Sequence, residues 1–133
     1  MTSVVLDASA LLAVFHGEPG ADIVRAVMPG ASISAVNYSE VLKKAIERGV
    51  PTEPLIGLVH GASVEIVPFD EALASASASL YPQTKQHGLS FADRACLALG
   101  VERKCKVLTS ERRMGLVVLP IKVELIRNHD GKH

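Results

Sequence analysis

Three acidic side chains stand where carboxylates could do chemistry at the edge of a sheet. Asp7 directly follows an apolar stretch at residues 4–6, Glu111 comes shortly after a second apolar stretch, and Asp93 lies in the first turn of a predicted helix. In open α/β folds the carboxyl ends of the strands meet at one edge, where ligands bind. Carboxylate oxygens gathered there suit Mg²⁺ or Mn²⁺. Without a cation they would repel one another and raise their own pKa values. These positions therefore indicate a candidate site for a divalent metal ion.

Helix capping explains the same positions without any chemistry. Asp7 could cap the helix that follows it, Ser90 and Asp93 have the spacing of a capping box, and Glu111 would complement a helix dipole. Asp70 begins a predicted helix in the same way, and nothing near it suggests chemistry. Position alone leaves both explanations open.

Glu40 is not selected by position or by periodicity. The apolar residues of the helix predicted over residues 35–48 form one stripe, which consists of Tyr38, Val41, Leu42 and Ala45. Glu40 falls about opposite this stripe, beside Lys43 and Lys44. Periodicity therefore predicts a solvated face for Glu40.

The segments that must position these acids alternate between short apolar strands and longer helices. Strands are predicted at residues 4–6, 31–34, 64–67, 106–108 and 122–126. Helices are predicted at residues 8–16, 19–28, 35–48, 54–60, 70–86 and 90–101, with a kink or break around Pro82. This alternation predicts an α/β fold with a short, mostly parallel sheet of about four to five strands and helices on both faces.

Length and composition indicate one soluble domain. The 133 residues suit a single domain over 1–133, with residues 128–133 as a loose tail. Fourteen basic and fourteen acidic residues cancel, which argues against a strong overall field for nucleic acid but not against a local basic patch. The start lacks the features of a signal peptide, and no apolar run approaches the ~18 residues of a membrane span. We expect a cytoplasmic protein without membrane contact.

The remaining reactive residues suggest little chemistry of their own. Cys96 and Cys105 indicate neither a disulfide framework nor a zinc site. Basic residues cluster at residues 43–48, 103–106 and 112–113, and the first two clusters are interpreted as solvated faces. Arg112 and Arg113 lie beside the candidate site and could contact phosphate, with Arg94 as a weaker candidate.

Aspartyl-phosphate chemistry is a competing class, because it also uses an Asp after a strand. A haloacid-dehalogenase-like phosphatase would need a second Asp where Ser9 stands. A receiver domain would need a Lys at the end of a late strand, where this chain has Thr109 and Ser110. Both mismatches argue against this class.

Taken together, four segments resemble a PIN-domain ribonuclease, and most closely the VapC type of toxin from bacterial toxin–antitoxin pairs. The segments are residues 4–13, 33–42, 89–99 and 107–113, in family order. The resemblance runs from Val4 to about Arg127 and implies a PIN-like fold.

The resemblance also assigns roles to residues. It implies that Asp7, Glu40 and Asp93 bind one or two Mg²⁺ or Mn²⁺ ions. The family usually has Asp at the fourth acidic position, where this chain has Glu111, and the resemblance implies that Glu111 joins the other three as a catalytic and metal-binding residue. Ser9 and Thr109 match polar positions that orient ligands or water.

The function implied by the resemblance is metal-dependent hydrolysis of RNA phosphodiester bonds by the toxin of a type II toxin–antitoxin system. A VapB-type antitoxin and homodimerisation would accompany it. Two alternatives stay open. One is a PIN-like binding module with weakened catalysis, which Glu111 motivates, and the other is a housekeeping RNA-processing nuclease with the same chemistry.

Overall fold

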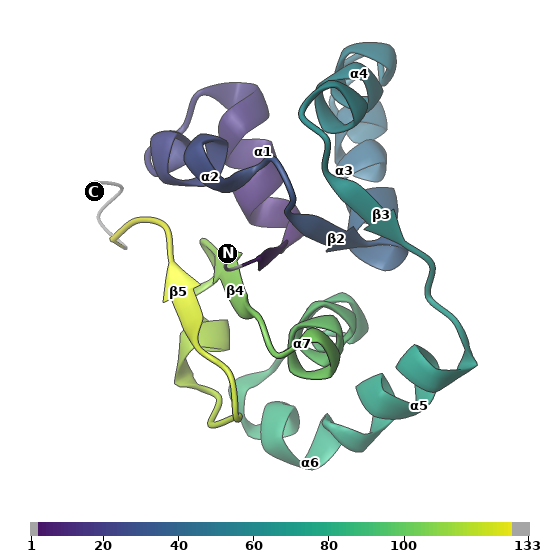
Figure 1. Cartoon of the computed structure of the whole chain (residues 1–133), viewed down its shortest axis with the longest axis vertical. Coiled ribbons are helices and arrows are strands. Elements are labelled where there is room, and N and C mark those ends of the chain that lie inside the picture. The colour runs from purple at the N-terminus through teal and green to yellow at the C-terminus, as the bar shows by residue number, and fades with distance from the viewer. Residues whose placement is uncertain (1–2, 129–133) are drawn as a thin grey trace.

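Five parallel strands form the central sheet of the computed structural model, which describes residues 3–128 (Figure 1). The strands are β1 (Val4–Leu6), β2 (Ser32–Ser34), β3 (Glu65–Val67), β4 (Lys106–Thr109) and β5 (Val123–Leu125). Their order is β3-β2-β1-β4-β5, and every neighbouring pair is parallel. The predicted α/β class and strand number are confirmed.

Helices cover both faces of this sheet, as predicted. They are α1 (Ala8–His16), α2 (Ala21–Val27), α3 (Ala35–Glu47), α4 (Glu53–Gly61), α5 (Glu71–Ser79), α6 (Tyr81–Thr84) and α7 (Phe91–Arg103). Two 3₁₀ segments, η1 (Lys85–His87) and η2 (Arg112–Leu116), complete the set. In Figure 1, α1 to α4 lie on one side of the sheet and α5 to α7 on the other. No helix within the described residues is both long and apolar enough to cross a bilayer.

The central strands are almost wholly buried, but only β1 is apolar throughout, because β2 buries Ser32 and Ser34 and β4 buries Thr109. Leu6 and Leu108 belong to the core beneath α1 to α4, whereas Val5 and Val107 belong to the core beneath α5 and α7. Successive side chains of a strand point to opposite faces, so β1 and β4 each contribute to both cores. Leu6 pairs with Leu108 across β1 and β4, and this register brings the residues after both strands together at one edge.

Helix capping is confirmed for Asp93 and Asp70, Glu111 caps the 3₁₀ segment η2, and the capping explanation is wrong for Asp7. Ser90 and Asp93 form a complete capping box at the start of α7, and Asp70 accepts a hydrogen bond from the backbone of Leu73. Asp7 occupies the N-cap position of α1, but its side chain makes no capping hydrogen bond. Its carboxylate is therefore available for another role.

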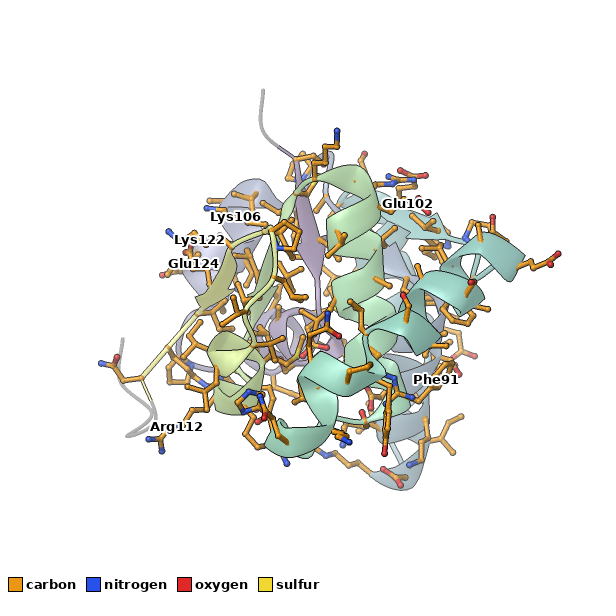
Figure 2. The ribbon with its side chains drawn as sticks, turned by 90° about the horizontal axis from the view of Figure 1, so that it is seen from below. Phe91, Glu102, Lys106, Arg112, Lys122 and Glu124 are labelled. Carbon is orange, nitrogen blue, oxygen red and sulfur yellow. The ribbon has the colours of Figure 1, made fainter. Side chains whose placement is uncertain are left out.

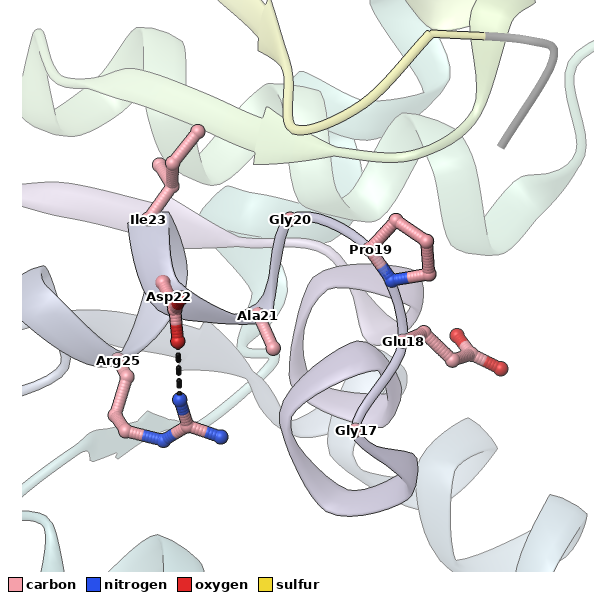
Figure 3. A pocket seen from close by; sticks show the side chains of 8 residues that line it. All are labelled: Gly17, Glu18, Pro19, Gly20, Ala21, Asp22, Ile23 and Arg25. Carbon is pink, nitrogen blue, oxygen red and sulfur yellow. Dashed lines mark hydrogen bonds and ion pairs between the residues drawn. The ribbon is translucent and has the colours of Figure 1, made fainter. Parts of the chain in front are cut away.

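The turn between α1 and α2 differs from the prediction. The second helix begins at Ala21 rather than Pro19, because Gly20 adopts a left-handed conformation with φ of 93°. A side chain at Gly20 would clash with the carbonyl oxygen of Ile126, so the turn lies directly against the chain after β5. Figure 3 shows this turn with the ion pair between Asp22 and Arg25, at 2.7 Å.

The other boundaries agree with the sequence within a few residues. The long helix predicted over residues 70–86 breaks into α5, α6 and η1, with Pro82 in the first turn of α6. The predicted tail falls almost wholly outside the described residues.

Candidate metal centre

All four candidate acids line one cavity of about 320 Å³ at the carboxyl edge of the sheet. Asp7 follows β1, Glu40 comes from α3, Asp93 from the first turn of α7 and Glu111 from the loop after β4. Two cationic side chains, Lys44 and Arg113, line the same cavity. Residues that lie far apart in the sequence thus surround one space with mixed but predominantly negative charge.

Asp7 is the most buried of these acids and is held by two hydroxyl groups. Its side chain is only 4% exposed. Ser9 Oγ and Thr109 Oγ1 each donate a hydrogen bond of 2.8 Å to Asp7 Oδ2. The same two hydroxyls accept hydrogen bonds from the backbone of Ser110 and Glu111, both at 2.9 Å. Ser9 and Thr109 therefore tie the Asp7 carboxylate to the loop after β4.

The carboxylates influence one another through their charges. Burial raises the pKa of Asp7 above its ordinary value, hydrogen bonds from Ser9 and Thr109 oppose this, and the charge of Asp93 raises it further. Burial also raises the pKa of Glu40, as do the charges of Asp7 and Asp93, while Lys44 opposes the shift. A bound cation would relieve this repulsion, because it favours the ionised form of each acid.

Glu40 lies at the edge of the buried face of α3, so the periodicity argument that placed it on a solvated face is wrong. The buried residues of α3 are Asn37, Val41 and Ala45. Glu40 and Lys44 flank this row and are half-buried. The periodicity argument assumed that the buried face of α3 consists of apolar residues. It therefore did not include the polar Asn37, which is part of that face.

Lys44 corrects the interpretation of the first basic cluster. The cluster at residues 43–48 was expected to be solvated, yet Lys44 lines the acidic cavity. Its position one helical turn after Glu40 is the signal that could have identified it, because residues four apart share a helix face.

Asn37 is a further residue that the sequence did not single out. It is fully buried, and its Nδ2 donates a hydrogen bond of 3.1 Å to the carbonyl oxygen of Ala92 in α7. Ala92 immediately precedes Asp93. Asn37 therefore joins the helix that carries Glu40 to the helix turn that carries Asp93.

Asp93 serves the capping box and the cavity together. Its Oδ2 accepts a hydrogen bond of 2.8 Å from the backbone of Ser90, and the residue is half-buried beside the cavity. Capping and a functional role were treated as alternatives, but the geometry is compatible with both, because a carboxylate has two oxygens.

Glu111 is engaged by Arg113. Glu111 Oε1 accepts hydrogen bonds from the backbone nitrogen of Arg113 at 3.1 Å and from its Nε at 2.9 Å. Arg113 Nη1 also donates to the carbonyl oxygen of Gly88, at 3.2 Å. The fourth acid is thus paired with a cation in this arrangement.

The three arginines suggested for RNA contact occupy different places. Arg113 lines the cavity. Arg112 is exposed at the same end of the molecule but points outward (Figure 2). The guanidinium of Arg94 lies over the Tyr81 ring, 5.5 Å from its centroid. Only Arg113 is part of the cavity wall.

The donor chemistry of this cavity fits a hard divalent cation. Within residues 3–128, no three acidic, His or Cys side chains are already arranged closely enough to hold a metal ion. Asp93 is hydrogen-bonded to the backbone of Ser90, and Glu111 to Arg113. Four carboxylates around one cavity, two of them with a raised pKa, nevertheless supply the oxygen ligands that such an ion prefers.

Several solved structures of toxin–antitoxin proteins share this fold. A chain in the structure of DNA-bound VapBC from Salmonella typhimurium has a TM-score of 0.72 and 17% identity, covering 95% of this chain and 99% of that chain. A toxin–antitoxin complex from Klebsiella pneumoniae gives a TM-score of 0.68, 20% identity and coverage of 90% and 99%. Mycobacterium tuberculosis VapC20, a Sarcin-Ricin loop cleaving toxin, has a TM-score of 0.70 and 14% identity, and the match covers 86% of this chain and 96% of that chain.

At these identities the structural likeness shows a shared fold. Among curated proteins the comparison found no match. A family model, described as the PIN domain, matches residues 4–117, which span β1 to just beyond η2 and include all four acids. This chain therefore belongs to the PIN domain family.

Proposed function

We propose that this protein is a metal-dependent endoribonuclease that hydrolyses RNA phosphodiester bonds and acts as the toxin of a type II toxin–antitoxin pair. The observation that carries the proposal is the convergence of four carboxylates, from four separate segments, on one cavity at the carboxyl edge of the sheet. Membership of the PIN domain family and a fold shared with VapC20 support the same conclusion.

Asp7, Glu40 and Asp93 would hold Mg²⁺ or Mn²⁺, with Glu111 as a fourth and weaker participant. When bound, such an ion activates water and neutralises charge on the attacked phosphate. Ser9 and Thr109 favour the ionised carboxylate of Asp7 and fix its orientation. Lys44 and Arg113 bring positive charge to the cavity, where they would attract a phosphate of the RNA backbone.

A VapB-type antitoxin is the proposed protein partner, and a homodimer is the proposed assembly. The antitoxin is supported by the solved structures, because several of the matching structures are toxin–antitoxin complexes. The experiment for this part is expression of the chain alone and together with the product of a small neighbouring gene. We expect growth arrest in the first case and relief in the second. A housekeeping nuclease would show neither effect.

A binding module with weakened catalysis is the second candidate, and the pairing of Glu111 with Arg113 favours it. If this pair persists when RNA binds, the fourth carboxylate does not reach a metal ion. The module predicts RNA binding without cleavage and without saturable binding of Mn²⁺.

The decisive experiment is RNA cleavage by the purified full chain with Mn²⁺ or Mg²⁺ and after chelation. We expect cleavage only with the metal, and a loss of at least about 100-fold in Asp7→Asn and Asp93→Asn, since each removes a charged ligand. Asp70→Asn is the matched control, because Asp70 caps α5 and does not line the cavity. Cleavage that survives in both site variants would overturn the proposal.

A further inference from the structure

Three of the five aromatic side chains of the protein gather beside the start of α7. They are Phe69, Tyr81 and Phe91. Tyr81 is 54% exposed and Phe91 is 51% exposed, so two large rings face solvent in a chain that has few rings. Scattered exposed apolar residues are ordinary, but a group of rings beside a functional cavity suggests a binding surface.

Phe91 is a chain neighbour of the acidic cavity, although it does not itself line it. It stands between Ser90 and Asp93, both of which line the cavity, and it opens the first turn of α7. In Figure 2 its side chain projects from the same end of the molecule as Arg112, whereas Glu102 and Lys106 lie toward the other end. A strand that leaves the cavity beside Ser90 would pass close to Phe91, the next residue in the chain.

The ring of Phe91 packs against a second aromatic ring. It meets Phe69 edge to face, with the centroids 5.5 Å apart and the ring planes at 87°. Phe69 is itself packed against the core beneath α5 and α7. This contact restrains the ring while about half of the side chain remains accessible to a stacking partner.

Positive charge accompanies these rings. The guanidinium of Arg94 lies over the Tyr81 ring, and Lys44 and Arg113 line the neighbouring cavity. Rings interleaved with cations suit single-stranded nucleic acid, because the rings stack with bases while the cations attract the backbone.

We propose that Phe91 stacks against an unpaired base of the RNA strand whose phosphate enters the acidic cavity. This inference rests on the proposed function and adds that the nucleotide beside the cleaved bond is unpaired. Aromatic side chains can read a base only when it is unstacked and splayed out, which a continuous duplex does not allow. Phe91 is therefore a residue that selects for loops or single strands.

The test uses a tryptophan reporter, because the natural chain contains no Trp. Phe91→Trp is made in the full chain together with Asp7→Asn, so that the RNA stays intact during the titration. Ile46→Trp in the same background is the control, because Ile46 is 68% exposed on α3 and does not line the cavity. The probes are a single-stranded oligoadenylate, an abasic oligomer of equal length, and a duplex of the oligoadenylate with its complement.

We expect the single strand to quench the tryptophan fluorescence of the Phe91→Trp variant saturably, and the abasic oligomer and the duplex to quench it much less. Ile46→Trp should respond weakly and equally to all three probes. In a separate binding titration, Phe91→Leu should weaken binding of the single strand by roughly 5- to 100-fold and leave the weaker binding of the abasic oligomer unchanged. Thermal unfolding of each variant checks that the chain remains folded.

Equal quenching by base-bearing and abasic strands would overturn the inference. So would a Phe91→Leu variant that binds the single strand normally but loses self-association or antitoxin binding, because the rings would then form a protein interface. These results are separable from the proposed function. If bases stack on Phe91 but the natural chain does not cleave RNA, only the proposed nuclease activity is refuted. If Phe91→Leu cleaves RNA normally and binds base-bearing and abasic strands as the natural chain does, only the proposed stacking is refuted.

Discussion

Thr109 Oγ1 donates a hydrogen bond of 2.8 Å to Asp7 Oδ2, joining the end of β4 to the residue after β1 inside the protein. Both residues are buried, and the same hydroxyl accepts the backbone N–H of Glu111 at 2.9 Å. One hydroxyl thus orients the central carboxylate and anchors the loop that carries the fourth acid.

Thr109→Val tests this relationship, because valine has nearly the shape of threonine but no hydroxyl. We expect a loss of about 1–3 kcal/mol in the free energy of unfolding, since a buried carboxylate loses a donor and a backbone N–H loses an acceptor. RNA cleavage should fall by roughly 10- to 100-fold. Thr109→Ser keeps the hydroxyl and is the control for both chemical denaturation and cleavage. Equal behaviour of the two variants would show that the hydroxyl is dispensable.

Asp7→Asn should change how stability depends on pH. Burial raises the pKa of Asp7, so the folded chain binds this proton more tightly than the unfolded chain does. Stability therefore falls as pH rises from about 4, the ordinary pKa of Asp, through the raised value. Without divalent ions, Asp7→Asn should be more stable than the natural chain at pH 7, by on the order of 1 kcal/mol. This advantage should vanish at a pH of about 3, below the ordinary pKa of Asp.

Thermal unfolding across this pH range makes the measurement, with Asp70→Asn as the comparison. Adding Mn²⁺ should raise the melting temperature of the natural chain and leave that of Asp7→Asn nearly unchanged, because a ligand stabilises only the state that binds it. An advantage that grows toward low pH would contradict the sign of the shift.

Asn37→Leu tests whether Asn37 positions the helices that carry Glu40 and Asp93 without contributing to the stability of the fold. Asn37 Oδ1 is buried without a hydrogen-bond partner, so an apolar residue of similar size removes an unfavourable group together with the bond to Ala92. We expect the free energy of unfolding to change by less than about 1 kcal/mol. Cleavage should nevertheless fall by roughly 10-fold, because the tie between the helices of Glu40 and Asp93 is lost. Ser39→Ala, on the exposed side of α3, should change neither quantity.

Lys44→Gln tests the cation inside the cavity. If Lys44 contacts a phosphate, its loss should weaken RNA binding and lower the slope of log affinity against log salt by about 1. Lys43→Gln is the matched control, because Lys43 is a neighbouring lysine that is 69% exposed and paired with Glu47 outside the cavity. Similar slopes for the two variants would indicate general electrostatic attraction only.

Glu111→Gln addresses the departure from the usual acid at the fourth position. Because Glu111 is held by Arg113 and is partly exposed, we expect its neutral variant to lose less than about 10-fold in cleavage. The loss should be much smaller than in Asp7→Asn, and calorimetry should give the same number of bound Mn²⁺ ions as in the natural chain. A loss as large as that of Asp7→Asn would make Glu111 a full ligand.

Local sequence signals predicted the elements and two of their ends. Ser90 and Asp93 were recognisable as a capping box, and the break near Pro82 followed from the chemistry of proline. The apolar periodicity of α3 predicted the wrong buried face, because the buried row of this helix contains the polar Asn37. Glu40 was supplied by family resemblance, Lys44 was assigned wrongly to a solvated cluster, and Asn37 was not singled out at all.

The sequence by itself determined the succession of strands and helices along the chain and the place of Asp7 at the end of a buried strand. These features depend on the alternation of apolar residues and on caps within a few residues, which are local. Only the tertiary structure decided which side chains of α3 and which arginines face the four acids. The face that a helix buries, and the charges that surround a carboxylate, depend on partners that the sheet brings together from distant segments, such as Asp7 with Thr109 and Asn37 with Ala92.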